Sequence, residues 1–177
     1  MFGIRASEIF IDDSSQPSLA EIRAKARRLI REEGGLDLII VDYLQLLSLP
    51  RVESRQQEIS IISRSLKSIA RDLQVPVLTL SQLNRAAEKR DNHRPLLADL
   101  RESGAIEQDA DLVGLLYKVA QDEDAEGAGE SEGLPVNLLI AKQRNGPTGD
   151  IPLTFLKAYT RFEPAARISD EDVPHEN

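Results

Sequence analysis

The sequence contains no cysteine and no tryptophan, and aromatic residues make up 4% of its 177 residues. Without cysteine, the chain has no disulfide framework, no thiolate nucleophile and no cysteine-based zinc site. The scarcity of aromatic rings argues against binding of single-stranded nucleic acid by base stacking. If the chain binds DNA, phosphate contacts must supply the affinity, and binding should be independent of base sequence and sensitive to salt.

Long apolar runs and histidine clusters are missing as well. The longest apolar runs have the length of a β-strand, which is too short to cross a membrane. The first residues lack the apolar region of a secretory signal, and the two histidines, His93 and His175, lie far apart. The content of 41% hydrophobic and 29% charged residues is that of an ordinary globular domain. We therefore expect a cytoplasmic protein without a membrane partner or a histidine-rich metal centre.

The net charge of −8 comes from 22 Lys and Arg against 30 Asp and Glu. Six of the acids lie in residues 121–133 and four in residues 168–177, and neither segment contains Lys or Arg. The rest of the chain carries 20 acids and 22 bases, so the acidic total does not exclude a nucleic-acid partner. We expect one domain at 1–167 that contains an acidic loop at 121–133, followed by a disordered tail at 168–177.

Helical and strand patterns alternate along the remaining sequence. A capping box of Ser18 and Glu21 predicts a helix that runs to about Glu33, and Ser54 with Gln57 predicts the start of a second helix. In the second helix, apolar residues recur at steps of three and four and form one stripe. The stripe consists of Ile59, Ile62, Leu66, Ile69 and Leu73.

Aliphatic runs predict strands of the type that is buried on both faces. These runs are Leu36–Val41, Val75–Leu80, Leu112–Tyr117 and Val136–Ala141, and a shorter apolar run lies at 9–11. Turn residues at 145–149 predict a hairpin between Val136–Lys142 and Ile151–Lys157. The alternation of strands and helices predicts an α/β fold with a mostly parallel sheet and an antiparallel edge.

Polar residues follow two of these strands, at the end where the sites of parallel α/β sheets gather. Asp42 directly follows Leu38–Val41, and nucleoside triphosphatases hold Mg²⁺ with a carboxylate fixed at a strand tip. Gln82 follows the strand that ends at Leu80, and its amide can donate to a γ-phosphate or accept from a water. The alternative for Asp42 is a turn-forming residue without a catalytic role.

Two cations, Lys142 and Arg144, share one face of a predicted strand and precede a tight turn. Such a pair suits an anion, because the planar guanidinium group matches the geometry of a phosphoryl group. The alternative is a solubilising edge strand, in which lysine prevents pairing with other chains.

Further basic residues could contact phosphates. The segment 99–104 combines Arg101 with Gly104, and a glycine lets backbone N–H groups approach a phosphate closely. A surface turn before a short helix explains this segment equally well. Four basic residues after Gln82 face either nucleic acid or solvent: Arg85, Lys89, Arg90 and Arg94.

Four segments of the sequence resemble, in this order, the bacterial replicative DNA helicase family, DnaB. They are Leu36–Leu47, which resembles the Walker B segment, and Val75–Arg85, Asp99–Asp111 and Ile140–Gly149. The resemblance covers most of residues 8–163. It implies a RecA-like P-loop NTPase core, with three layers, that is incomplete at its N-terminus. It also implies a ring-shaped hexamer of copies of the chain, which uses ATP to move along single-stranded DNA and to unwind duplexes in DNA replication.

The resemblance implies a role for each candidate residue. Asp42 would position Mg²⁺ through its water shell, and Gln82 would couple the state of the γ-phosphate to the DNA-binding loops. Arg144 would be an arginine finger that reaches the nucleotide of a neighbouring subunit, with Lys142 beside it. The loop that lines the central channel would contain three residues: Arg101, Glu102 and Gly104.

One part of the family pattern is missing, because the sequence contains no G-x-x-x-x-G-K-[ST] motif. The resemblance places the P-loop, the catalytic glutamate and the N-terminal domain before residue 1, and a missing strand beside Val75–Leu80. Because the P-loop is the principal cradle of a triphosphate, we expect the chain alone neither to bind ATP tightly nor to hydrolyse it. An uncovered aliphatic strand promotes aggregation, so we expect a complementing P-loop-bearing half, an isolated fragment, or a split or truncated gene.

Two functions fit these observations. The first is the C-terminal part of a replicative helicase motor, which is active when joined to the missing half and which other replication proteins could bind. Asp42, Lys142 and Arg144 favour this function. The second is a non-catalytic RecA-like module that binds DNA or a helicase ring, and the absence of a P-loop favours it.

Overall fold

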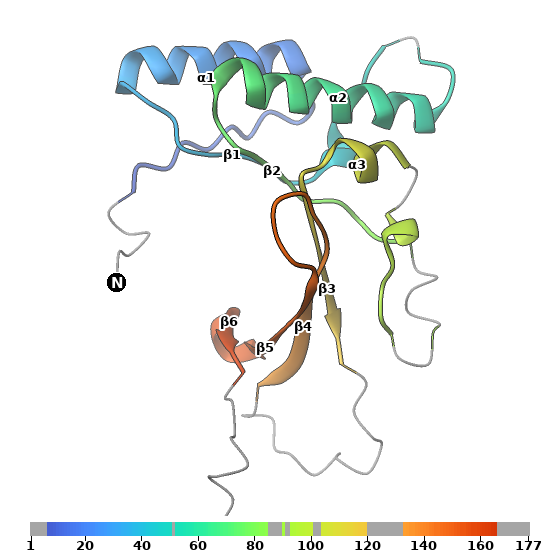
Figure 1. Ribbon diagram of the computed structural model, residues 1–177. Coiled ribbons are helices and arrows are strands. Elements are labelled where there is room, and N and C mark those ends of the chain that lie inside the picture. Colours follow the sequence, from blue (N-terminus) through green and yellow to red (C-terminus); the bar gives the residue numbers. More distant parts are fainter. Residues whose placement is uncertain are drawn as a thin grey trace, which may run out of the picture. The chain divides into compact units, whose positions relative to one another are not determined.

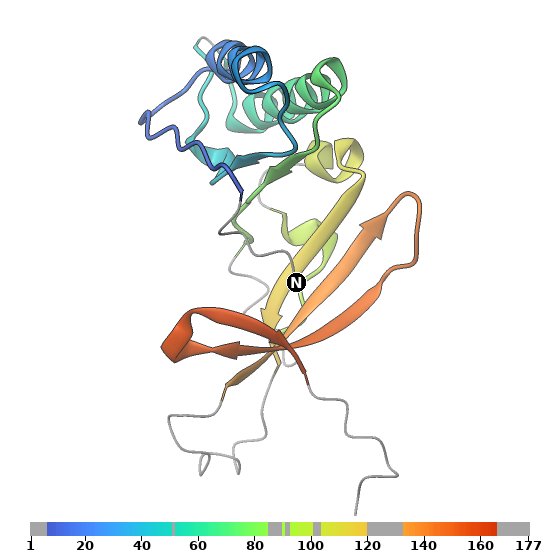
Figure 2. The same ribbon diagram turned by 90° about the vertical axis from the view of Figure 1, so that its left-hand side faces the viewer.

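The computed structural model describes residues 7–50, 52–84, 90, 93–100, 104–119 and 133–165. The chain divides into two compact units, Met1–Ser81 and Gln82–Asn177. Among the described residues, the first unit contains two α-helices and a pair of strands, and the second contains one short α-helix and a larger sheet (Figures 1 and 2). Within the described residues, no helix combines the length and the apolar character that a membrane span requires.

The two long helices of the first unit begin at the predicted caps, and the first ends where predicted. Helix α1 spans Leu19–Glu33 and starts with the capping box: the Glu21 amide donates to Ser18 Oγ, and the Ser18 amide donates to the Glu21 carboxylate. It ends at Gly34, whose φ of 80° lies in the left-handed region that glycine adopts without strain. Helix α2 spans Arg55–Leu73, and Ser54 Oγ accepts a hydrogen bond from the Gln57 amide.

The strands β1, Ile39–Val41, and β2, Val77–Thr79, form a two-stranded parallel sheet. Their register places Ile39 opposite Val77. Helices α1 and α2 lie on the same side of this pair (Figures 1 and 2). The predicted stripe of α2 provides the core, because Ile59, Ile62, Leu66 and Ile69 are all buried. Burial of each such side chain contributes roughly 1.5–3 kcal/mol to folding.

The other side of the strand pair is uncovered in this structure, and the prediction of burial on both faces is wrong there. Four aliphatic side chains are between 44% and 59% exposed: Leu38, Ile40, Leu78 and Leu80. An aliphatic run indicates that a strand face is buried, but it does not indicate which polypeptide buries that face. The apolar run at 9–11 forms no strand and is also exposed.

The second unit contains a four-stranded sheet in the order β3-β4-β5-β6, in which every neighbouring pair is antiparallel. The strands are β3, Leu112–Lys118; β4, Leu134–Gln143; β5, Gly149–Leu156; and β6, Arg161–Pro164. The predicted hairpin is confirmed as β4 and β5, with Leu138 opposite Ile151. Val113, Leu115, Val136 and Leu139 form the buried part of the sheet.

The prediction of a mostly parallel sheet needs correction, because β1 and β2 are the one parallel pair among the described strands. Strand β3 pairs antiparallel with β4 instead. Aliphatic composition indicates burial but not strand direction. A parallel connection also needs a crossover of a dozen or more residues, usually a helix, and the acidic segment between β3 and β4 has no helical pattern.

Candidate functional site

Asp42 lies where the sequence predicts it, directly after β1, with an exposed side chain. The two strand ends stay paired beyond the sheet, because the Leu80 amide donates to the Val41 carbonyl at 3.0 Å and the Leu44 amide donates to the Leu80 carbonyl at 2.9 Å. Asp42 and Ser81 therefore follow the carboxyl ends of two neighbouring parallel strands. This is the position of ligand sites in α/β sheets, although binding of Mg²⁺ stays a prediction.

The segment after Asp42 is anchored to α2 by Arg55, a residue that sequence reasoning did not select. Its Nη2 donates to the Gln45 carbonyl at 2.6 Å, and its Nη1 contacts Glu58 Oε2 at 2.5 Å. Glu58 also accepts a hydrogen bond from the Leu49 amide at 2.6 Å, and this bond, followed by that of Arg55, holds the pKa of the Glu58 carboxyl below its usual range. The spacing of Arg55 and Glu58 on one turn of the helix is the signal that could have identified the pair.

Gln45 links the same segment to the tip of β2. Its Nε2 donates to Ser81 Oγ at 2.9 Å, while its Oε1 is buried and has no hydrogen-bond partner among the described residues. Most buried polar atoms in proteins are hydrogen-bonded. The strand tips therefore present one acceptor that this part of the chain does not satisfy.

Gln82 is exposed and begins the second unit, so its predicted grouping with Asp42 stays a prediction. The residues after it are fixed to a later segment by an isolated antiparallel bridge between Leu83 and Leu100. The Asn84 amide donates to the Asp99 carbonyl at 2.8 Å, in the same register.

Lys142 and Arg144 converge on one point, as the prediction of a shared face requires. Arg144 Nη2 donates to the Gln108 carbonyl at 2.7 Å, and Lys142 Nζ donates to the same carbonyl at 3.2 Å and to the carbonyl of Glu107. These carbonyls belong to the last residues of α3, Gly104–Asp109. Arg144 Nε also lies 3.5 Å from Asp111 Oδ1. The two cations therefore lie together at the C-terminal end of a helix, where cations are favoured.

The alternative of a solubilising edge strand stays open for Lys142. Lys142 pairs with Val113 of β3, but the pairing of β4 with β5 ends at Ile140.

The predicted DNA-contacting loop lies mostly outside the described residues, which do not include Arg101 or Glu102. Gly104 is the first residue of α3 and is exposed, with no heavy atom within 4 Å of the position that a Cβ would occupy. This open space is compatible with the close approach of another molecule, but contact with DNA stays a prediction.

Two of the four basic residues after Gln82 are paired with acids. Arg90 binds both oxygens of Asp99, and Arg94 Nη1 lies 2.7 Å from Asp150 Oδ2. The guanidinium of Arg90 is engaged within the unit but stays 34% exposed, so a surface facing nucleic acid or solvent stays a prediction for this residue. Arg85 and Lys89 lie outside the described residues.

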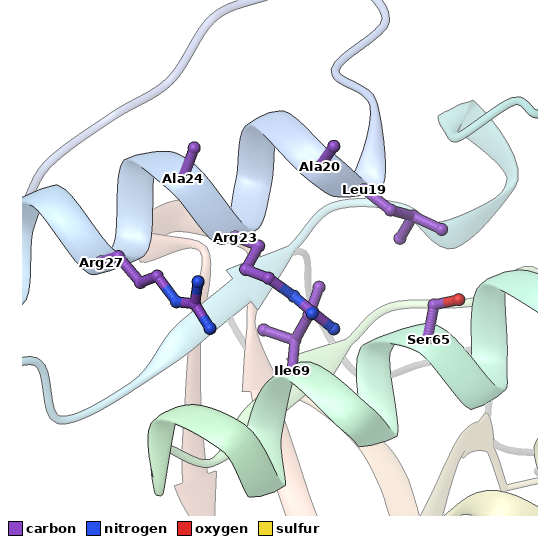
Figure 3. A pocket seen from close by; sticks show the side chains of 7 residues that line it. All are labelled: Leu19, Ala20, Arg23, Ala24, Arg27, Ser65 and Ile69. Carbon is purple, nitrogen blue, oxygen red and sulfur yellow. The ribbon is translucent and has the colours of Figure 1, made fainter.

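The groove between α1 and α2 is separate from these candidates (Figure 3). Its volume is about 340 Å³, and it is lined by Leu19, Ala20, Arg23, Ala24, Arg27, Ser65 and Ile69. Arg23 Nη2 lies 3.3 Å from Asp72 Oδ2. None of the predicted site residues lines this groove.

The described residues also contain no group of three acidic or histidine side chains that could hold a metal ion.

Comparison with solved structures defines the class of this fold. One solved ATPase domain is similar with a TM-score of 0.79 and 42% identity, over 92% of this chain and 57% of that chain. A DnaB-like replicative helicase, solved in a study of its interactions with primase, is similar with a TM-score of 0.74 and 43% identity, over 85% of this chain and 36% of that chain. The fold is therefore part of a helicase ATPase domain.

Sequence comparison gives the family. The profile of the DnaB-like helicase C-terminal domain matches residues 2–164. The chain is 49% identical over 177 residues to the replicative DNA helicase DnaC of Bacillus subtilis strain 168, and 52% identical over 167 residues to the replicative DNA helicase DnaB of Leifsonia xyli. It spans 38% and 35% of the lengths of these two relatives. The chain belongs to the DnaB-like helicase C-terminal domain family.

Proposed function

We propose that the chain is the C-terminal part of a replicative DNA helicase motor, which couples ATP hydrolysis to movement on single-stranded DNA and to duplex unwinding. The observation that carries this proposal is the convergence of Lys142 and Arg144 on the Gln108 carbonyl. It presents two neighbouring cations from one strand end, as an anion site requires. The family membership supports the same function, because the relatives are replicative helicases.

In this proposal Arg144 acts as an arginine finger toward the nucleotide of a neighbouring subunit in a hexameric ring. A guanidinium has five N–H donors, and its contacts to Gln108 and Asp111 engage two of its three nitrogens. The Gln108 carbonyl thus orients the group while leaving donors for a phosphoryl oxygen. Lys142 adds positive charge beside it. Such a finger stabilises the charge that develops in the transition state.

Asp42 and Gln82 are proposed to serve the nucleotide on the same subunit. The exposed carboxylate of Asp42 at a strand tip suits Mg²⁺, which prefers oxygen ligands and usually keeps several waters. Gln82 would sense the γ-phosphate. The chain fits ATP and Mg²⁺ in part, because its sequence lacks the P-loop motif that cradles the phosphates.

The missing cradle is proposed to come from a P-loop-bearing half that covers the open side of β1 and β2. The observation that supports this partner is the set of four exposed aliphatic side chains on that side. Single-stranded DNA, bound through Arg101, Glu102 and Gly104, and further copies of the chain are the other proposed partners. Primase is a further candidate, since a similar helicase interacts with it.

The test is the ATPase rate of the chain mixed with a P-loop-bearing half of a related helicase. The mixture should hydrolyse ATP and respond to single-stranded DNA, and Arg144→Ala should lower turnover by about 10³-fold or more. Arg161→Ala is the matched control, because Arg161 lies in the same unit and contacts Glu163. An Arg144→Ala mixture as active as wild type would contradict the finger role.

Because this sequence contains no P-loop motif, we keep a second candidate function, that of a non-catalytic module that binds DNA or a helicase ring. The same mixture separates the two functions. Association with the P-loop half without any gain in ATP hydrolysis would favour the non-catalytic module.

A further inference from the structure

Arg90 and Asp99 form an ion pair, and neither residue has a role in the proposed motor described above. Asp99 is 4% exposed and lies in the short 3₁₀ helix Leu97–Asp99. Arg90 Nη1 lies 2.5 Å from Asp99 Oδ2, and Nη2 lies 2.8 Å from Oδ1. The Leu96 amide donates to Oδ2 at 2.7 Å. Three N–H groups therefore hold one buried carboxylate, and they keep the Asp99 pKa below its usual range, with Arg90 as the main cause.

Arg90 is itself fixed by backbone contacts. Its carbonyl accepts a hydrogen bond from the His93 amide at 3.0 Å, and its Nη1 donates to the Arg94 carbonyl at 3.2 Å. A bidentate arginine–carboxylate contact is directional as well as strong. The pair therefore sets the position of residue 99 relative to the turn that begins at Arg90.

The backbone of Asp99 connects this pair to the segment of Gln82. The Asp99 carbonyl accepts the hydrogen bond from Asn84, and Leu100 is bridged to Leu83. One peptide bond beyond Leu83 is Gln82, and one peptide bond beyond Leu100 is Arg101. Gln82 and Arg101 are therefore the sequence neighbours of the two bridged residues.

We propose that Arg90 and Asp99 are positioning residues that lock the Leu83–Leu100 bridge in register and thereby couple Gln82 to the segment that enters Arg101. This inference rests on the proposed function, which makes Gln82 the nucleotide sensor and Arg101 a DNA contact. The ion pair suits this task because a buried carboxylate without its cation is strongly destabilised. The bridge is therefore held in one register instead of sliding.

The first test measures backbone hydrogen exchange in the chain alone, which needs neither ATP nor DNA. Arg90→Met and Asp99→Asn should each raise the exchange rate of the Asn84 amide about tenfold or more, while the β3–β4 amides keep their rates. Asp72→Asn is the matched control, since it removes the partner of Arg23 in the other unit. Unchanged exchange at Asn84 in both variants would overturn the inference.

The second test uses the mixture with the P-loop-bearing half. Each variant should lower the ratio of DNA-stimulated to basal ATPase about tenfold, and the double variant should lower it no further, because both changes break one interaction. Equal losses of the two rates, or losses that multiply in the double variant, would overturn the coupling role. If the wild-type mixture hydrolyses no ATP, the proposed function fails, and the exchange result still decides whether the pair holds the bridge.

Discussion

The two sides of the β1–β2 pair are both aliphatic, but the helix side is buried and the other side is exposed. On the helix side, four side chains of the α2 stripe are between 0% and 4% exposed, whereas four side chains in or next to the strands are between 44% and 59% exposed on the other side. The side chains of α2 bury one side, and we propose that polypeptide outside these residues buries the other. Apolar character therefore marks a surface to be buried and does not identify the partner that buries it.

The largest expected effect comes from the covered side. Ile62 is 0% exposed within the α2 stripe. Replacing it with alanine should lower the free energy of unfolding by about 2–5 kcal/mol, because the methylene groups removed leave a cavity. Urea denaturation followed by circular dichroism measures this change. A loss below about 1 kcal/mol would contradict the assignment of the core to this side.

An intermediate effect is expected from acid, through the carboxyl groups whose pKa is lowered in the folded chain. Glu58 in the first unit and Asp99 in the second are both held in the charged form by N–H donors. Because their folded pKa values lie below the ordinary values of about 4, their stabilisation is complete above pH 4 or so. It is lost as the pH falls through the lowered values.

Urea midpoints between about pH 6 and pH 3 measure this loss. Glu58→Gln and Asp99→Asn should each lower stability near neutral pH and flatten the acid-side decline. A decline as steep in both variants as in the wild-type chain would show that other groups cause it.

The smallest effect on stability is expected from the open side. Ile40 is 59% exposed, so Ile40→Thr should change the free energy of unfolding by no more than about 0.5 kcal/mol. The same substitution should reduce self-association of the chain and weaken its binding to the P-loop-bearing half, because it removes apolar surface from the proposed interface. Light scattering and size-exclusion chromatography measure both. Undiminished binding to the half would place the interface elsewhere.

Local signals in the sequence predicted the local structure. The Ser18 and Ser54 caps, the α2 stripe and the β4–β5 hairpin are confirmed because neighbouring residues determine each of them. The position of Asp42 after β1 follows in the same way, from the point where an aliphatic run ends.

Features that depend on distant residues could not be predicted. Aliphatic composition is the same for parallel and antiparallel strands, so the sheet was predicted to be more parallel than it is. The contact of Lys142 and Arg144 with Gln108 joins residues more than 30 positions apart. The Arg90–Asp99 pair depends on a turn that no pattern marks, and a basic stretch alone does not reveal which of its members has an acidic partner.

The most direct test of the account is the rate of ATP hydrolysis by an equimolar mixture of this chain and a P-loop-bearing half, with and without single-stranded DNA. We predict that neither polypeptide alone hydrolyses ATP at a significant rate, whereas the mixture does so and is stimulated by DNA. A mixture in which both polypeptides fold and associate but hydrolyse no ATP would contradict it.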